Sequence, residues 1–595
     1  MLSFEKMDLP KEGSGWNPAS LQAEITTLLG AEGAAGDRLL AALPFACGDA
    51  TAGVEDELQA VVVGDRSRVD LAISLEQSNY LKNIRRRVAA GELPPRVVAD
   101  FERYLEECSG HSWDNSWVRF PWAALSPAAS QVFQDDLLAD KRQPDGPLRR
   151  DIERFIFQQQ GEQWLRMPIS YLLKLALADA AGREPETPPL IRRTGGRLLA
   201  HFLNDNTSPE TFSFHVTPLR RETANGRAVA KESLKRFLLT QLLVEYANEQ
   251  FGLRRSGQHA MVYFAPNAPG GQRRLNELVP DSFYRELFMS PCLSGWDEGE
   301  AKHRYMILCH QTLSRSHLNG VAKLKEAGII TRNLVVLPNI SNLSLANNGT
   351  HVSLGSRRLG ALLADRASGF GPAHEKHAGD LAIKIVEHFL PLFVGTYSAA
   401  PYRLDFEDFH PERALGFLPH ELDYTHLRMI WRRWTRKANL KIFGHPVTPF
   451  GPPLLDRSLQ RLFSLRGDLV PDFRLIDYLV ALRSTDQSPA LDGRLGSGER
   501  LKQDLTAMGV FDSAMSLYLL YRLRKFRAMG FSGFEGRHYS LFASLEHDLS
   551  GAVDLQLLLT ALAFKYILTG QVSHAHIPDD PTVESERRQI FFGRA

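Results

Sequence analysis

The chain has 595 residues, and its 70 Lys and Arg against 69 Asp and Glu give a formal net charge of +1. This balance argues against a dedicated nucleic-acid binder, because such proteins carry a basic excess that neutralises phosphates. The apolar fraction of 44% is that of a globular protein and excludes wholesale disorder. The four cysteines form no CxxC pair, which predicts reduced thiols rather than a disulfide framework.

The sequence shows neither an N-terminal apolar segment of signal-peptide length nor an apolar run of roughly 20 residues. We therefore expect a soluble, cytoplasmic protein with no membrane partner. The most hydrophobic segment, residues 557–564, reads LLLTALAF and is followed by Lys565. This pattern predicts a buried helix.

In chain order, the β-branched residues between Gly53 and Gly64 predict a strand over 53–63. A largely helical region follows over about 81–328. Further strands are predicted at 261–266, 333–338 and from residue 350 onward. Helices are predicted at 233–251, 307–327, 380–393, 513–529 and 552–568, four of them ending at or near a glycine. The polar segment 484–500 predicts a loop.

Glu55 and Glu57 are two residues apart on the first predicted strand, so both lie on one face of it. Two buried carboxylates repel each other and need a cation, and Mg²⁺ prefers oxygen ligands of this kind. The alternative is an exposed edge strand with a solvated acidic face. The residues themselves leave both interpretations open.

Two further segments carry chemistry-bearing residues. His351 follows a glycine-containing turn, where it can either bind a metal or phosphate or be a satisfied core histidine. Asp472 and Arg474 share a face of a strand-like run. An arginine beside a metal-bound phosphate stabilises transferring phosphoryl charge, but a surface ion pair explains the same pattern.

In order and spacing, these segments resemble the glutamate–cysteine ligase and carboxylate–amine ligase family. Residues 53–57 (GVEDE) are similar to its Gly-[Ile/Val]-Glu-x-Glu strand, and 349–355 (GTHVSLG) to its Gly-x-His-Val-His-Val-Gly strand. Residues 398–402 (SAAPY) resemble its Ser-Ala-x-Ser-Pro-[Phe/Tyr] turn, and 470–477 (VPDFRLID) its Val-Glu-x-Arg-[Val/Leu]-x-Asp strand. Three positions depart from the family pattern, namely Ser353, Ala400 and Asp472.

The resemblance implies an α/β (α+β) protein of glutamine synthetase-like fold, whose antiparallel sheet carries helices on its outer face. The concave face of such a sheet holds ATP, Mg²⁺ and an amino-acid carboxylate. Carried over to this chain, the resemblance makes Arg474 and Glu57 catalytic, and it makes Arg474, Arg466 and Arg413 contact the nucleotide or the acid substrate. The implied metal ligands are Glu55, Glu57, Glu76, His351 and Asp472, with Asp70 as the runner-up to Glu76.

The resemblance also divides the chain. It covers 46–95 and 331–485 as the catalytic core, which leaves 1–45 as an N-terminal segment. Residues 96–330 then form a mainly helical insertion, and 486–595 a helical C-terminal region. The insertion could provide a lid, a partner surface or a macromolecular acceptor site.

The leading hypothesis is an ATP- and Mg²⁺-dependent ligase that joins an amino-acid carboxylate, with the γ-carboxylate of glutamate as the expected acid, to an amine through an acyl phosphate. Its partners would be small amino-acid and amine substrates, and a homo-oligomer stays open. The alternative is a non-catalytic member of the same fold that binds a protein or a nucleic acid.

Overall fold

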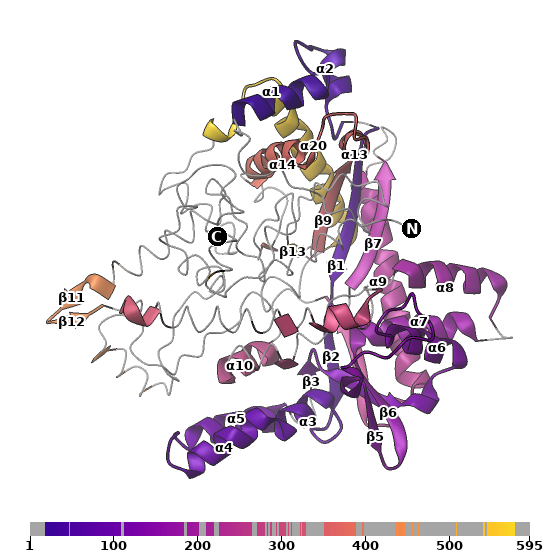
Figure 1. The fold of residues 1–595 in the computed structure, drawn as a ribbon, viewed down its shortest axis with the longest axis vertical. Coiled ribbons are helices and arrows are strands. Elements are labelled where there is room, and N and C mark those ends of the chain that lie inside the picture. Colours follow the sequence, from indigo (N-terminus) through magenta and orange to yellow (C-terminus); the bar gives the residue numbers. More distant parts are fainter. Residues whose placement is uncertain are drawn as a thin grey trace.

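The computed structural model describes residues 18–46, 48–108, 112–183, 187–201, 210–218, 225–264, 270–279, 297–304, 350–387, 438–447 and 544–576, together with shorter pieces between 283 and 541. These residues mix helices with small antiparallel sheets (Figure 1). The α+β class is therefore confirmed at this coarse level. The glutamine synthetase-like arrangement stays a prediction.

The largest sheet, called sheet A, has five strands in the order β10-β13-β9-β1-β7. Every pairing in it is antiparallel, and β9, β1 and β7 lie side by side in Figure 1. Its strands are β1 (Ala50–Glu57), β7 (Glu210–Pro218), β9 (Thr350–Ser356), β10 (Thr396–Tyr397) and β13 (Tyr539–Leu541). The sheet thus combines segments that are hundreds of residues apart in the chain.

Helices cover one face of sheet A. They are α1 (Pro18–Leu28), α2 (Asp37–Ala42), α9 (Asn225–Gln250), α13 (Arg357–Ala364), α14 (Pro372–Glu387) and α20 (Ser550–Leu568), with a short π-helical turn, η9 (Leu545–Leu549), before α20. The apolar positions of β1 and β9 pack against α9 and α20 in one hydrophobic cluster, which includes Val54, Leu354, Val229 and Phe564. We call this cluster the β1 core.

The predicted strand over 53–63 is wrong as a single element. The chain leaves sheet A after Glu57, and residues beyond Leu58 enter a second sheet as β2 (Gln59–Gly64). Leu58 is fully buried, and β2 pairs with β3 (Ser112–Asp114) and β8 (Gln258–Tyr263) instead of with the partners of β1. The local sequence does not reveal this change of partner, because the partners of each strand come from segments far along the chain.

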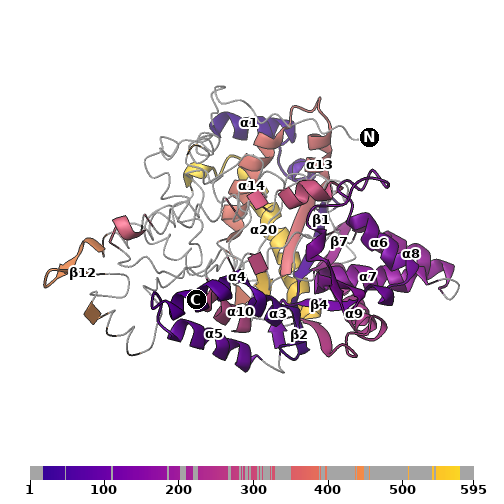
Figure 2. The ribbon, with the colours of Figure 1, turned by 60° about the horizontal axis from the view of Figure 1, so that its bottom comes forward.

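A second cluster, called the β2 core, lies between β2 and a further three-stranded sheet. That sheet has the order β4-β6-β5, formed by β4 (Trp117–Pro121), β5 (Ile156–Gln159) and β6 (Glu162–Pro168). Figure 2 shows α6, α7 and α8 together on the right and α3, α4, α5 and α10 together to the left of β2. The helices are α3 (Asp70–Gln77), α4 (Asn79–Ala89), α5 (Arg96–Glu107), α6 (Pro127–Asp136), α7 (Ile169–Gly182), α8 (Pro189–His201) and α10 (Gly270–Leu278).

Short elements complete the description. They are the 3-10 turns η1 (Trp122–Ala124), η2 (Ile152–Arg154) and η10 (His574–His576), and the hairpin of β11 (Lys441–Ile442) and β12 (His445–Pro446). The predicted insertion at 96–330 therefore holds strands β3–β8 as well as helices, and its β7 belongs to sheet A. From the C-terminal region, β13 joins sheet A and α20 packs into the β1 core. The domain boundaries themselves stay predictions.

Three of the predicted helix ends are confirmed by backbone geometry. Gly252 follows α9 with φ of 66°, Gly328 follows helical residues 324–326 with φ of 70°, and Gly570 follows α20 with φ of 70°. A residue at the C-terminal end of a helix often takes this left-handed conformation, which glycine adopts without a steric penalty. The predicted strand at 333–338 and the helix at 513–529 lie outside the described residues.

Helix α20 contains the hydrophobic segment that predicts a buried helix, and its packed face is buried as expected. Leu557 and Phe564 are 3% and 1% exposed. In the described part of the chain, one helical stretch, His547–Leu568, is long and apolar enough to cross a membrane, and half of its apolar 18-residue window is buried inside the molecule. A core helix of a soluble protein passes the same test of length and composition.

Candidate functional site

Strand β1 carries the predicted acid pair at its C-terminal end. Val54 and Asp56 are fully buried on the face that packs against α9, where the hydroxyl of Ser233 donates a hydrogen bond to Asp56 Oδ2. Because successive residues of a strand alternate between faces, Glu55 and Glu57 occupy register positions on the opposite face of sheet A. This is the placement that the sequence predicts for them.

The register of sheet A places His351 directly opposite Glu55. Strand β9 runs antiparallel to β1, with Gly53 paired to Ser353 and Glu55 paired to His351. Directly opposed residues of an antiparallel pair share a face, with Cβ atoms about 4.5–5.5 Å apart. Two segments that the sequence singled out independently, almost 300 residues apart, therefore meet on one face of one sheet.

A third acid, Glu210, lies on the same face and was not predicted. On the other side of β1, strand β7 pairs Glu57 with Glu210 and Glu55 with Phe212. Like charges directly opposite each other destabilise a sheet unless a cation offsets them. The alternating residues of 211–217, TFSFHVT, carry a strand signal that could have located Glu210.

The remaining predicted ligands fall into two groups. Glu76 lies on α3 rather than on a strand and forms an ion pair with Arg66, while Asp70 is buried at the start of the same helix. Arg413, Arg466, Asp472 and Arg474 lie outside the described residues. Among the side chains that the structure describes, no group of three or more His, Cys, Asp or Glu could hold a metal ion. The side chains of Glu55, Glu57 and His351 are outside that set.

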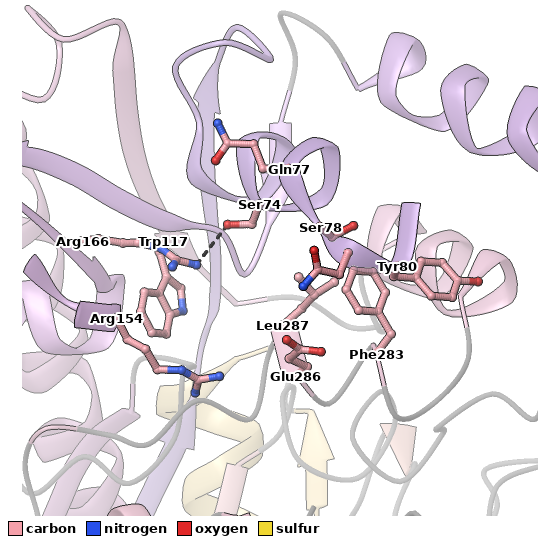
Figure 3. Close-up of a pocket in the computed structure, with 11 residues that line it drawn as sticks. Ser74, Gln77, Ser78, Tyr80, Trp117, Arg154, Arg166, Phe283, Glu286 and Leu287 are labelled. Carbon is pink, nitrogen blue, oxygen red and sulfur yellow. Dashed lines mark hydrogen bonds between the residues drawn. The ribbon is translucent and has the colours of Figure 1, made fainter. Parts of the chain in front are cut away.

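A cavity of about 350 Å³ lies at a separate place, beside the β4-β6-β5 sheet (Figure 3). It is lined by the end of α3, the start of α4, one residue each from β4, β6 and η2, and a segment near residue 285. The lining residues are Ser74, Gln77, Ser78, Asn79, Tyr80, Trp117, Arg154, Arg166, Phe283, Glu286 and Leu287. We call this cavity the arginine pocket.

Arg166 is held in place on the wall of the arginine pocket. Its Nε lies 2.6 Å from Asp70 Oδ1, its Nη2 donates a hydrogen bond of 3.0 Å to Ser74 Oγ, and its guanidinium carbon lies 4.8 Å from the centre of the Trp117 ring. Asp70 also pairs with Arg119 at 2.6 Å. The predicted runner-up ligand is therefore occupied by two arginines, which explains why a carboxylate can be buried there.

Arg154 is the second guanidinium of the arginine pocket, and the described residues give it no ion-pair partner within 4.0 Å. Burial, together with the nearby positive charge of Arg166, lowers the pKa of Arg154 below its usual value. Glu286 also lines the cavity, and Figure 3 shows its carboxylate and the Arg154 guanidinium in the same lower part of the view. The negative charges of Asp151 and Glu286 act in the opposite direction, raising the pKa of Arg154, but burial and Arg166 outweigh them. An anionic group bound beside Arg154 would offset the desolvation of its guanidinium.

The apolar part of the arginine pocket is aromatic. Tyr80 and Phe283 stack with their ring centres 4.5 Å apart. Within the described part of the chain, neither the Arg154 guanidinium nor the Glu286 carboxylate forms an ion pair within 4.0 Å. A cavity with these two charges and aromatic walls suits a small molecule that carries both charges. Sequence reasoning missed this site because two isolated arginines, one on η2 and one on β6, form no local pattern.

Comparisons with known proteins add no assignment to these two sites. No family model matches the chain, and neither the curated proteins nor the solved structures contain a match.

Proposed function

We propose that this chain is an ATP- and Mg²⁺-dependent carboxylate–amine ligase whose metal ions bind on the face of sheet A that carries Glu55, Glu57 and His351. The observation that carries the proposal is the register of β1 and β9, which pairs Glu55 with His351. The opposition of Glu57 and Glu210 adds a reason for a cation at the same place.

The chemistry follows from this donor set. Carboxylates and a neutral imidazole suit a divalent ion that also binds phosphate oxygens. Such ions neutralise charge as the substrate carboxylate attacks the γ-phosphorus of ATP and ADP departs. The amine then attacks the acyl carbon, loses a proton and expels phosphate. In this proposal Asp472 is a further ligand, and Arg474 stabilises the transferring phosphoryl group.

Thermal unfolding with and without millimolar ATP and Mg²⁺ tests the proposal. Ligand at about 100 times its dissociation constant stabilises a folded protein by roughly 2.7 kcal/mol, so the wild-type midpoint is expected to rise by several degrees. Glu57→Gln is expected to abolish that rise, because the amide removes a metal ligand and its charge. Glu162→Gln, at an exposed position of β6, is the matched control and should leave it intact.

The absence of any shift in the wild type, or an equal shift in Glu57→Gln, would overturn the ligase proposal. ATP consumption screened across amino acids paired with amines then identifies the substrates.

A second candidate function is amino-acid binding without catalysis, which the arginine pocket favours. Arg154 and Glu286 would bind the carboxylate and the ammonium group of one zwitterion, and the aromatic walls would contact its side chain. In this candidate the ligand of a non-catalytic protein is a small molecule instead of a protein or a nucleic acid. It does not depend on the sites of sheet A.

The same thermal assay separates the two candidates. Free amino acids without nucleotide are expected to raise the midpoint in the second case, and Arg154→Met should remove that rise while leaving any effect of ATP. Arg150→Met is the control, because Arg150 is 84% exposed in its side chain and lies nearby in the chain. If no amino acid shifts the wild type, the arginine pocket is not an amino-acid site.

A further inference from the structure

Helix α9 exposes a stripe of leucines. Leu234, Leu238 and Leu242 are spaced four residues apart and are 42%, 60% and 61% exposed. Residues four apart lie one above another on the same face of a helix. The other faces of α9 contribute to both hydrophobic cores, so among the described residues this stripe is the part of the helix that stays exposed.

Charged residues of opposite sign flank the leucine stripe. Arg227 and Lys231 are exposed on its N-terminal side, and Glu245 and Glu249 on its C-terminal side. Arg254 pairs with Oε1 of both glutamates, whose side chains remain 55% and 63% exposed. Their Oε2 atoms therefore stay available to another donor, and exposed ion pairs of this kind contribute little stability by themselves.

These seven residues are arranged symmetrically about Leu238. Leu234 and Leu242 are each four positions away, Lys231 and Glu245 are each seven, and Arg227 and Glu249 are each eleven. At 3.6 residues per turn, all of them lie within about 40° of a line along the helix through Leu238. A two-fold axis through Leu238 would therefore place each basic residue opposite an acidic one.

We propose that two copies of this chain associate through α9, packed antiparallel about a two-fold axis at Leu238. In this arrangement Leu238 contacts its own copy, Leu234 contacts Leu242, Lys231 faces Glu245 and Arg227 faces Glu249. A self-complementary surface of this kind is what a two-fold dimer requires, because residue i contacts j while j contacts i. The reversed sign of charge along one helix selects a second copy, in antiparallel orientation, over a partner of uniform charge.

The oligomeric state of the full chain tests this interface. Light scattering after size-exclusion chromatography should give twice the chain mass for the wild type. Leu238→Glu places two carboxylates together at the two-fold axis and should raise the dissociation constant by at least about 100-fold, because like charges across an interface are strongly unfavourable. Leu558→Glu is the matched control, since Leu558 is a 55% exposed leucine on α20, and it should leave the dimer intact.

Exchanging the charges of Lys231 and Glu245 distinguishes a broken interface from a misfolded chain. Lys231→Glu alone and Glu245→Lys alone should each weaken the dimer, and the double variant should restore it. A monomeric wild type at high concentration, or a dimer that Leu558→Glu breaks and Leu238→Glu does not, would overturn the proposal. Failure of the double variant to restore association would exclude the antiparallel pairing of Lys231 with Glu245.

Discussion

Asp136, at the end of α6, is a buried carboxylate held by two lysines and a tyrosine. Lys141 Nζ lies 2.5 Å from its Oδ1, Lys174 pairs with its Oδ2, and Tyr171 donates a hydrogen bond of 2.7 Å. Burial alone would raise the pKa of Asp136, but the charges of Lys174 and Lys141 outweigh burial and hold the pKa below its usual value. The folded protein therefore binds a proton at Asp136 less readily than the unfolded chain does.

We expect this network to stabilise the fold at neutral pH and to lose its effect in acid. A lowered folded-state pKa contributes stability above the unfolded pKa of about 3.9, and that stability disappears as pH falls through the folded value. Asp136→Asn should cost about 3–5 kcal/mol at pH 7, because it leaves two largely buried lysines without their carboxylate. In urea unfolding, the deficit of the variant should shrink toward pH 3.

The neighbouring exposed Asp135 offers the control for this measurement. Asp135→Asn should change the free energy of unfolding by less than about 0.5 kcal/mol at either pH. A deficit of Asp136→Asn that stays constant between pH 7 and pH 3 would contradict the assigned pKa shift.

Single residues differ in how far the sequence reveals them. Glu55, Glu57 and His351 were predictable because strand alternation and a turn glycine place them without any knowledge of the tertiary fold. Arg154 and Arg166 were not, since an isolated arginine on a surface element has the same local sequence whether it lines a cavity or faces water. Their role depends on Asp70, Trp117 and the burial that other elements impose.

At the scale of elements, the start of α9 lies very close to the start of α20. A Cβ atom at Gly226 would lie 1.8 Å from the carbonyl oxygen of Ser550, and the Gly226 N–H donates a hydrogen bond of 2.9 Å to Asp554 Oδ1. Only glycine lets the start of α9 approach the start of α20 this closely. The hydrophobic pattern of either helix carries no trace of this contact.

We expect Gly226→Ala to cost about 3 kcal/mol, because the two helices must separate to admit a methyl group. Gly551→Ala is the matched control on α20, where a Cβ atom would meet nothing within 4 Å. The control should instead gain about 0.5 kcal/mol from helix propensity. Denaturant unfolding measures both, and an equal effect of the two substitutions would refute the close approach.

The positions of helices and strands along the chain were predicted better than the pairing of strands and the packing of helices. Strand β9 and helices α9 and α20 were located from periodicity and glycine stops, since these signals depend on local backbone preferences. The division of 53–63 between two sheets was missed, because the partners β7, β3 and β8 are set by packing far along the chain. The exposed leucine stripe of α9 was also not predicted, because the sequence of this helix has an ordinary amphipathic pattern.

At the scale of the whole molecule, two continuous elements connect the two cores. β1 contributes Val54 to the β1 core, and β2, one residue further along, contributes Val62 to the β2 core. Helix α9 does the same with Val229 at one end and Val244 at the other. Loss of packing in one core therefore also destabilises the β1–β2 segment and α9, which contribute side chains to the other core.

We expect the two cores to unfold together. Leu354→Ala, in the β1 core, should cost about 2–5 kcal/mol and should also raise amide hydrogen exchange in α7, which packs only in the β2 core among the described residues. Leu165→Ala, in the β2 core, should have the reciprocal effect on α14. Leu148→Ala is the control, because that side chain is 50% exposed. If hydrogen exchange in α7 does not respond to Leu354→Ala, the two cores are independent folding units. In that case α9 would have to unfold locally between the cores, so that the loss of packing in the β1 core does not reach the β2 core.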